Sequence, residues 1–238
     1  MTDKIIIDDV YKLPCFYSAI TDMYMIHASG SGGIALKWVR DTLCEKELQA
    51  ESLQHINAYA AMDKLAESIP AGSEGLIVLP HFQGSGEPDV NQYAKGAIYG
   101  ASLSHTRAHI IRAFMEGIAV CVYRMVESVQ ELMNFDIKEV IALSGGANSA
   151  LWCQIKADVL GKPVITMEGT QDAACLGAAI LAGYGIGIFE SVPEAAEKIT
   201  KRIQTYTPNR DHRDIYDATI TKYKLLTNAL FPIAEELQ

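Results

Sequence analysis

The residues best suited to chemistry lie in one short segment, Ser144-Gly145-Gly146-Ala147-Asn148-Ser149. An apolar run at residues 140–143 precedes it and a helical pattern starts at Ala150, which predicts a strand, a glycine turn and a helix. Glycines let the backbone approach a ligand closely, and the free N–H groups that open a helix favour anionic or polar groups. A nucleotide is the obvious candidate. The alternative is a tight connection in which Asn148 or Ser149 caps the helix, and the glycines alone leave both interpretations open.

Other candidate motifs carry less information. The glycine run at residues 30–33 opens a helical pattern but lacks the lysine of a phosphate loop. His105 and His109 are four residues apart, but no third ligand suggests itself, so we predict no metal site. Glu87 and Asp89 could face a cleft, although a solvated loop is their expected place.

Composition narrows the class of protein. The 238 residues are 49% hydrophobic and 21% charged, which suits a globular protein with a real core. A net charge of -9 without a long basic cluster argues against binding to nucleic acid or to anionic lipid and favours a small-molecule ligand. The five cysteines are scattered and form no Cys-x-x-Cys pair, which indicates a reducing compartment. With no signal peptide or membrane span evident, we expect a cytoplasmic protein.

The elements that must position the glycine turn alternate between strands and helices. The sequence predicts strands at residues 5–7, 23–27, 76–79, 96–99, 140–143 and 163–166. It predicts helices at residues 34–43, 52–69, 104–133, 150–160, 173–182 and 213–230. No repeat, low-complexity tract or linker interrupts this order, so a single α/β domain over residues 1–238 is the simplest interpretation.

Several of these segments resemble a known family. Residues 96–109 and 112–119 look like the second half of the FGGY carbohydrate kinases. Residues 144–154, with 157–164 after them, are similar to the C-terminal signature of xylulokinase-like members, and residues 171–179 extend the match. The motifs keep their order over residues 79–183, and a weaker match surrounds Trp38.

This resemblance implies a fold and a ligand. The expected fold is a ribonuclease-H-like lobe of the sugar kinase, actin and Hsp70 superfamily, with a mixed sheet flanked by helices and an incomplete N-terminus. In such kinases ATP or ADP lies with Mg²⁺ in a cleft between two lobes. By position, Gly145 and Gly146 would let the backbone pass the nucleotide, and Asn148 would sit near the adenine or ribose. Gly33 and Lys37 match nucleotide contacts of glycerol-kinase relatives, where a glutamine stands in place of Lys37.

The resemblance also implies what this chain lacks. The sugar site and the aspartate that acts as general base belong to the family's first lobe, and nothing before Tyr11 resembles its Gly-Thr-Ser phosphate loop. We therefore expect the C-terminal, nucleotide-binding portion of a kinase that phosphorylates a sugar or polyol hydroxyl, inactive alone and without a catalytic residue of its own. The alternative is a stand-alone nucleotide-binding or assembly module. Apolar surface left by the absent lobe would promote self-association, for example as a homodimer.

Overall fold

The computed structural model describes residues 1–30 and 32–238, apart from the side chain of Thr170; Ser31, in the glycine run, lies outside the described residues. The helices are α1 (Gly33–Leu43), α2 (Glu45–Gln54), α3 (Ala58–Glu67), α4 (Arg107–Met133), α5 (Ala150–Leu160), α6 (Ala173–Gly185), α7 (Val192–Ile199) and α8 (Arg213–Glu236). The strands are β1 (Cys15–Tyr17), β2 (Tyr24–Ile26), β3 (Ile77–Leu79), β4 (Ala97–Tyr99), β5 (Val140–Ala142), β6 (Val164–Met167) and β7 (Arg202–Tyr206). Short 3₁₀ turns lie at η1 (Ser73–Gly75), η2 (Gly145–Ala147), η3 (Thr170–Asp172) and η4 (Arg210–His212).

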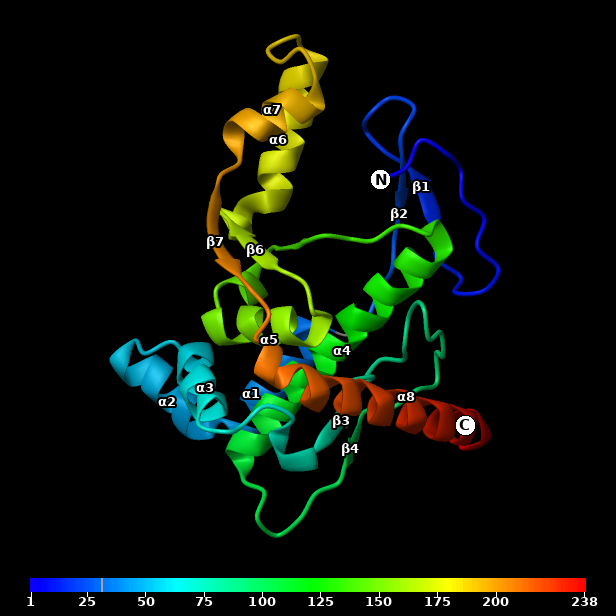
Figure 1. Ribbon diagram of the computed structural model, residues 1–238. Coiled ribbons are helices and arrows are strands. Elements are labelled where there is room, and N and C mark those ends of the chain that lie inside the picture. Colours follow the sequence, from blue (N-terminus) through cyan, green and yellow to red (C-terminus); the bar gives the residue numbers. More distant parts are fainter. Residues whose placement is uncertain (31) are drawn as a thin grey trace.

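The long helix α4 runs through the centre of the molecule (Figure 1). Helices α1, α3, α5 and α8 and strand β3 pack around it. Residues 111–121 of α4 are buried without interruption, although the apolar periodicity predicts only one buried stripe. Because neighbours cover this helix on all sides, its polar residues in that stretch need partners inside the core.

Those polar residues form one buried network around Glu116. One carboxylate oxygen of Glu116 accepts hydrogen bonds from the Gly72 amide at 2.9 Å, Arg112 Nε at 2.9 Å and the Tyr216 hydroxyl at 3.1 Å. The other accepts from Ser73 Oγ at 2.7 Å. The network therefore joins α4 to the segment before β3 and to α8.

The strands form three separate small sheets. Strands β1 and β2 pair antiparallel, as do β3 and β4. Strand β6 pairs parallel with β5, where Val140 faces Val164, and antiparallel with β7, where Val164 faces Tyr206. Helix α5 packs on β6 and β7. The expected mixed sheet is thus present within the described chain as a three-stranded sheet, while the other strands stand apart from it.

Several elements differ from the sequence-based expectations. Residues 5–7 are not a strand, because Ile5 and Ile7 find no pairing partner and lie exposed. The helix expected at residues 52–69 is two helices, α2 and α3, because His55 adopts a left-handed conformation and Asn57 caps α3 by accepting from the Ala60 amide. Helix α7 and strand β7 were not predicted, and α8 continues beyond residue 230 through Pro232.

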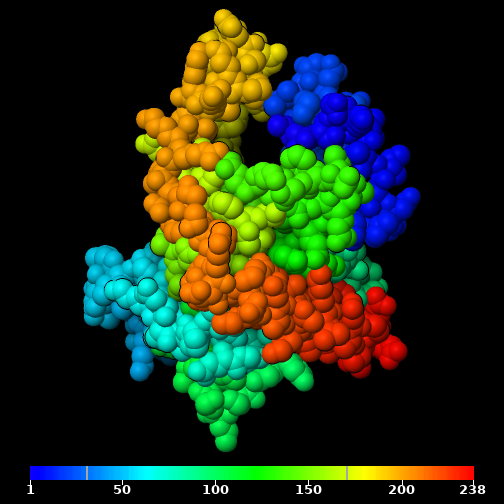
Figure 2. Space-filling view, in the orientation of Figure 1, coloured from blue at the N-terminus to red at the C-terminus, as the bar shows by residue number. Residues whose placement is uncertain are grey.

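An arm made of α6 and α7 projects from the body of the molecule, opposite the β1–β2 hairpin (Figure 1). Figure 2 shows an open gap between the arm and this hairpin. Apolar side chains at the end of the arm are exposed, with 42% of Tyr184, 77% of Ile186 and 67% of Ile188 accessible. No helix in the described part of the chain has both the length and the apolar character that crossing a membrane requires.

Candidate functional site

The glycine turn lies where the sequence predicts it, between β5 and α5. Ser144 leaves the strand with φ 64° and ψ -166°, a region that is costly for residues other than glycine. Turn η2 follows, in which the Ala147 amide donates to the Ser144 carbonyl at 3.0 Å and the Asn148 amide to the Gly145 carbonyl at 3.2 Å. Ser149 then caps α5 by accepting from the Trp152 amide at 3.0 Å. The capping predicted as an alternative is therefore real, and it leaves the turn itself open to a ligand.

The two glycines of the turn have different surroundings. A Cβ atom on Gly146 would lie 3.0 Å from the Trp152 ring and 3.4 Å from Lys156 Nζ, so packing within the chain accounts for this glycine. A Cβ on Gly145 would meet no atom within 4 Å. Neither glycine amide donates to a backbone carbonyl among the described residues. Gly145 is thus the position where the space beside the backbone is open, and its amide and that of Gly146 are the free donors of the turn.

Trp152 and Lys156 support the turn from α5. Trp152 Nε1 donates to the Met115 carbonyl of α4 at 3.0 Å, which fixes the indole ring. Lys156 Nζ lies 4.1 Å from the centre of that ring and donates to the Gly146 carbonyl at 3.3 Å. Burial lowers the pKa of Lys156, while Cys153 opposes this shift. The turn is therefore held by side chains one helical turn apart on a single helix face.

Asn148 and its neighbours form the outer edge of the turn. The Asn148 side chain is exposed, so it is available to a ligand. Asp63 of α3 lies beside Ser149; burial raises the pKa of its carboxyl group, and a hydrogen bond with Ser149 opposes the shift. Helix α3 therefore brings an acidic group to the start of α5.

The other predicted nucleotide contacts, Gly33 and Lys37, lie on α1. Gly33 is the first residue of this helix, and a Cβ there would meet nothing within 4 Å. Lys37 is exposed and forms an ion pair with Asp41. A groove of about 500 Å³ runs along this face, lined by Ile34, Lys37, Trp38, Asp41, Phe82 and Gln83. Its volume is within the range of small-molecule sites.

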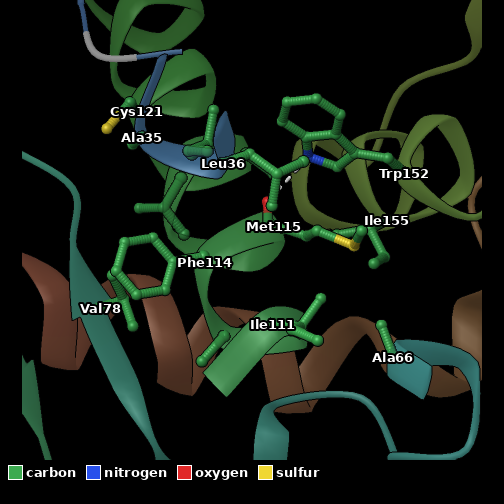
Figure 3. Close-up of a cluster of buried hydrophobic side chains, with 14 of the residues drawn as sticks. Ala35, Leu36, Ala66, Val78, Ile111, Phe114, Met115, Cys121, Trp152 and Ile155 are labelled. Carbon is green, nitrogen blue, oxygen red and sulfur yellow. Dashed lines mark hydrogen bonds between the residues drawn. The ribbon is translucent and has the colours of Figure 1, made fainter. Parts of the chain in front are cut away.

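The predicted site residues therefore form two walls. One is the turn with Gly145, Gly146 and Asn148, and the other is the α1 face with Gly33 and Lys37. No hydrogen bond or ion pair joins the two walls within residues 1–30 and 32–238. Both rest on the same core cluster, in which Leu36 of α1 and Trp152 of α5 lie close to Met115 (Figure 3).

Comparison with known proteins identifies the family to which this chain belongs. The mixed α/β fold belongs to the sugar kinase and actin superfamily. The chain is a member of the FGGY family of carbohydrate kinases, because residues 11–186 match the C-terminal domain of that family. This confirms the xylulokinase-like resemblance seen in the sequence motifs.

The individual relatives are much longer than this chain. It is 29% identical to the gluconokinase of Bacillus subtilis over 239 aligned positions, which cover 98% of this chain and 46% of that relative. It is 30% identical to the xylulose kinase of Bacillus subtilis over 201 positions, covering 84% of this chain and 38% of the relative. The chain thus spans less than half the length of the relatives it matches.

Solved structures agree with this assignment. A xylulose kinase from Rhodospirillum rubrum matches with a TM-score of 0.82 at 28% identity, over 98% of this chain and 45% of that one. A glycerol kinase from Plasmodium falciparum, solved with ADP, matches with a TM-score of 0.75 at 20% identity, over 94% of this chain and 44% of that one. The latter likeness shows a shared fold.

The predicted segment included Ser144 but did not indicate its conformation, and sequence reasoning gave Trp152 and Lys156 no role in holding the turn. Trp152 and Lys156 are four residues apart on a helix that starts at the turn. This spacing predicts that both side chains lie on one face of the helix. The strain at Ser144 has no signal in the residue types, because serine is common in ordinary turns.

Proposed function

We propose that this chain is the C-terminal, nucleotide-binding portion of an ATP-dependent carbohydrate kinase, folded as a ribonuclease-H-like lobe. The whole enzyme would transfer the γ-phosphoryl group of ATP to a sugar or polyol hydroxyl. Membership of the FGGY family supports the class of reaction. The observation that best supports a nucleotide site is the open space beside Gly145. In the described chain, the amides of Gly145 and Gly146 also lack a backbone acceptor.

In this proposal each wall has a separate task. The amides of Gly145 and Gly146 donate hydrogen bonds to the nucleotide, and Asn148 contacts its adenine or ribose. Gly33 and Lys37 line the second wall, where the Lys37 ammonium can leave Asp41 to meet an anionic group. Mg²⁺, when bound with the nucleotide, neutralises charge on the phosphates. Phosphoryl transfer depends mainly on such positioning and electrostatic stabilisation.

The remaining catalytic parts belong, in this proposal, to the amino-terminal half of a complete kinase. That half holds the sugar and the general base, and closure of the two lobes excludes water. The present chain alone is therefore inactive. A stand-alone nucleotide-binding or assembly module is the second candidate, because the chain spans less than half of its relatives.

The nucleotide site is tested by calorimetry of the chain with ADP and Mg²⁺. We expect Gly145→Val to weaken binding by at least about tenfold, because the new side chain fills the space that the ligand needs, a loss of about 1.4 kcal/mol. Gly185→Val is the matched control, since a Cβ there also meets nothing within 4 Å but the residue ends α6 on the arm. Equal affinity of wild type and Gly145→Val would contradict the assignment.

A second measurement separates the two candidate functions. The purified chain is mixed with ATP, Mg²⁺ and xylulose, gluconate or glycerol, and ADP release is followed. We expect no sugar-dependent release from the chain alone. Appearance of that activity on adding the amino-terminal half of an FGGY kinase would support the kinase portion, whereas robust activity without it would refute the predicted inactivity.

A further inference from the structure

Lys156 is a half-buried cation without an acidic partner. Within residues 1–30 and 32–238, ion pairs of lysine involve Lys12, Lys37, Lys138, Lys162, Lys198, Lys201 and Lys224. The described lysines outside that set are exposed, with the exception of Lys156. Partial burial of an ammonium group costs free energy unless other contacts offset it. The contacts that hold Lys156 are the Trp152 ring and the Gly146 carbonyl.

The Gly146 carbonyl belongs to the same planar peptide unit as the Ala147 amide. Lys156 Nζ holds the carbonyl end of this unit, and the Ser144 carbonyl accepts the amide end. Glycine gives such a unit little intrinsic preference, so the Gly146–Ala147 peptide could rotate cheaply if one end were released. The Cys153 thiol also donates to the Gly146 carbonyl, at the longer distance of 3.7 Å. The amide end of the unit is therefore held by a backbone hydrogen bond, while the carbonyl end depends on side chains, with Lys156 as the charged donor.

We propose that Lys156 is a positioning residue of the candidate nucleotide site, which holds the Gly146–Ala147 peptide in one orientation and thereby keeps the turn in the shape that presents its free amides. The identity of the ligand in this proposal rests on the proposed function. The effect of Lys156 on the Gly146–Ala147 peptide can be measured without any nucleotide. The ammonium acts through the turn, while Trp152, anchored to Met115, sets the direction of the lysine.

The first test uses the ligand-free chain. Hydrogen exchange of single amides is measured by NMR for wild type and Lys156→Met, which keeps an apolar stem of similar length but removes the donor and the charge. We expect the Ala147 amide to exchange at least about fivefold faster in the variant, since loss of a charge-assisted hydrogen bond frees the peptide unit. Amides at the far end of α5, such as that of Leu160, should be unchanged. Unchanged exchange at Ala147 overturns the proposal.

The second test measures ADP and Mg²⁺ binding by calorimetry. Lys156→Met should weaken binding about tenfold while leaving the unfolding temperature within a few degrees of wild type. Lys156→Arg keeps a donor and a cation over the ring, and we expect it to retain most of the affinity and of the Ala147 protection. Lys162→Met is the matched control, because Lys162 is also largely covered but pairs with Asp136 at 2.8 Å. It should bind ADP like wild type.

The outcomes distinguish this proposal from the proposed function. If wild type binds no ADP while Ala147 exchange still rises in Lys156→Met, the nucleotide assignment is wrong, but Lys156 does hold the Gly146–Ala147 peptide in place. If wild type binds ADP and Lys156→Met binds it equally well, the positioning role is wrong and the nucleotide site stands. A loss of affinity without any change in Ala147 exchange would mean a direct ligand contact, which also overturns positioning.

Discussion

At the scale of the residue, the two glycines of the turn show how far a motif can be interpreted. The sequence treats Gly145 and Gly146 alike, and the resemblance to the FGGY kinases assigns both to the nucleotide. The surroundings separate them, because Trp152 and Lys156 occupy the space beside Gly146 while the space beside Gly145 is open. Substitution at Gly146 therefore disturbs packing as well as any ligand, and Gly145 is the informative position.

The backbone at Ser144 leads to a prediction for stability. Its φ of 64° with ψ -166° is a conformation that glycine adopts without penalty. We expect Ser144→Gly to raise the free energy of unfolding by about 1 kcal/mol. This is a net value, because the relief of backbone strain in the folded state is partly offset by the greater flexibility of glycine in the unfolded chain. Urea unfolding measures the change. Ser149→Gly, at the cap of α5, should instead destabilise, since it removes the bond to the Trp152 amide.

His81 makes stability depend on pH. It is 4% exposed, its Nε2 lies 2.8 Å from the Tyr223 hydroxyl, and burial lowers its pKa to about 4, with the Asp89 charge opposing the shift. The folded state thus keeps His81 neutral where the unfolded chain already binds a proton. Protonation of His81 in the unfolded chain should therefore lower the free energy of unfolding by about 3 kcal/mol as pH decreases from about 6.5 to 4.

Urea unfolding across that pH range tests the assignment to His81. His81→Gln keeps a polar side chain that does not titrate, so its unfolding free energy should vary less with pH than that of wild type. His55→Gln is the control, because His55 is exposed at the end of α2. Parallel pH profiles for wild type and His81→Gln would rule out this origin.

At the scale of the element, the buried network on α4 joins three parts of the chain. Glu116 is 2% exposed and Arg112 is 6% exposed. We expect Glu116→Gln to cost about 3 kcal/mol of unfolding free energy, because it leaves the guanidinium of Arg112 buried without its counter-charge. The double variant Arg112→Met with Glu116→Leu should recover part of this loss, since it removes both charges together. A change below about 1 kcal/mol in Glu116→Gln would contradict the ionic role.

Elements with strong local signals were predicted well. Helix α5 has the predicted bounds, because Ser149 caps its start and Gly161, in a left-handed conformation, ends it. The central part of α4 and the strand at β5 follow equally clear apolar patterns. Elements that depend on partners were not predicted, as strand β7 shows: four of its five residues are exposed, and only its pairing with β6 makes it a strand.

In the candidate site, too, the features with a local sequence signal were predicted and those that depend on distant partners were not. Residue types located the glycine turn, because a turn between an apolar strand and a helix is a local pattern. They could not give the conformation of Ser144. Nor could they give the direction of Lys156, whose ammonium lies over the indole ring that a hydrogen bond to α4 holds in place. Family membership settles the class of protein, while the roles of Gly33, Lys37, Gly145, Gly146 and Asn148 stay predictions.

At the scale of the whole molecule, the arm and the exposed apolar surface affect association. The single domain over residues 1–238 stays a prediction, and so does self-association. We expect sedimentation to show an apparent mass that rises with concentration, because Ile186 and Ile188 are exposed at the end of the arm. The double variant Ile186→Ser with Ile188→Ser should weaken this rise.

The control for that experiment is Leu103→Ser, since Leu103 is fully exposed but lies in the loop before α4, away from the arm. It should associate like wild type. A monomer at every concentration would count against the prediction, and equal association of the arm variant would show that another surface is responsible.

The contrast between Trp38 and Trp152 has a practical consequence. They are the two tryptophans of the chain, 42% and 6% exposed, and one stands at each candidate wall. Indole emission shifts to shorter wavelength in apolar surroundings, and a soluble quencher reaches chiefly an exposed ring. A ligand in the α1 groove would therefore alter the quenchable emission of Trp38, while a change in the glycine turn would alter the protected emission of Trp152. The unlabelled protein thus carries a separate optical reporter for each wall.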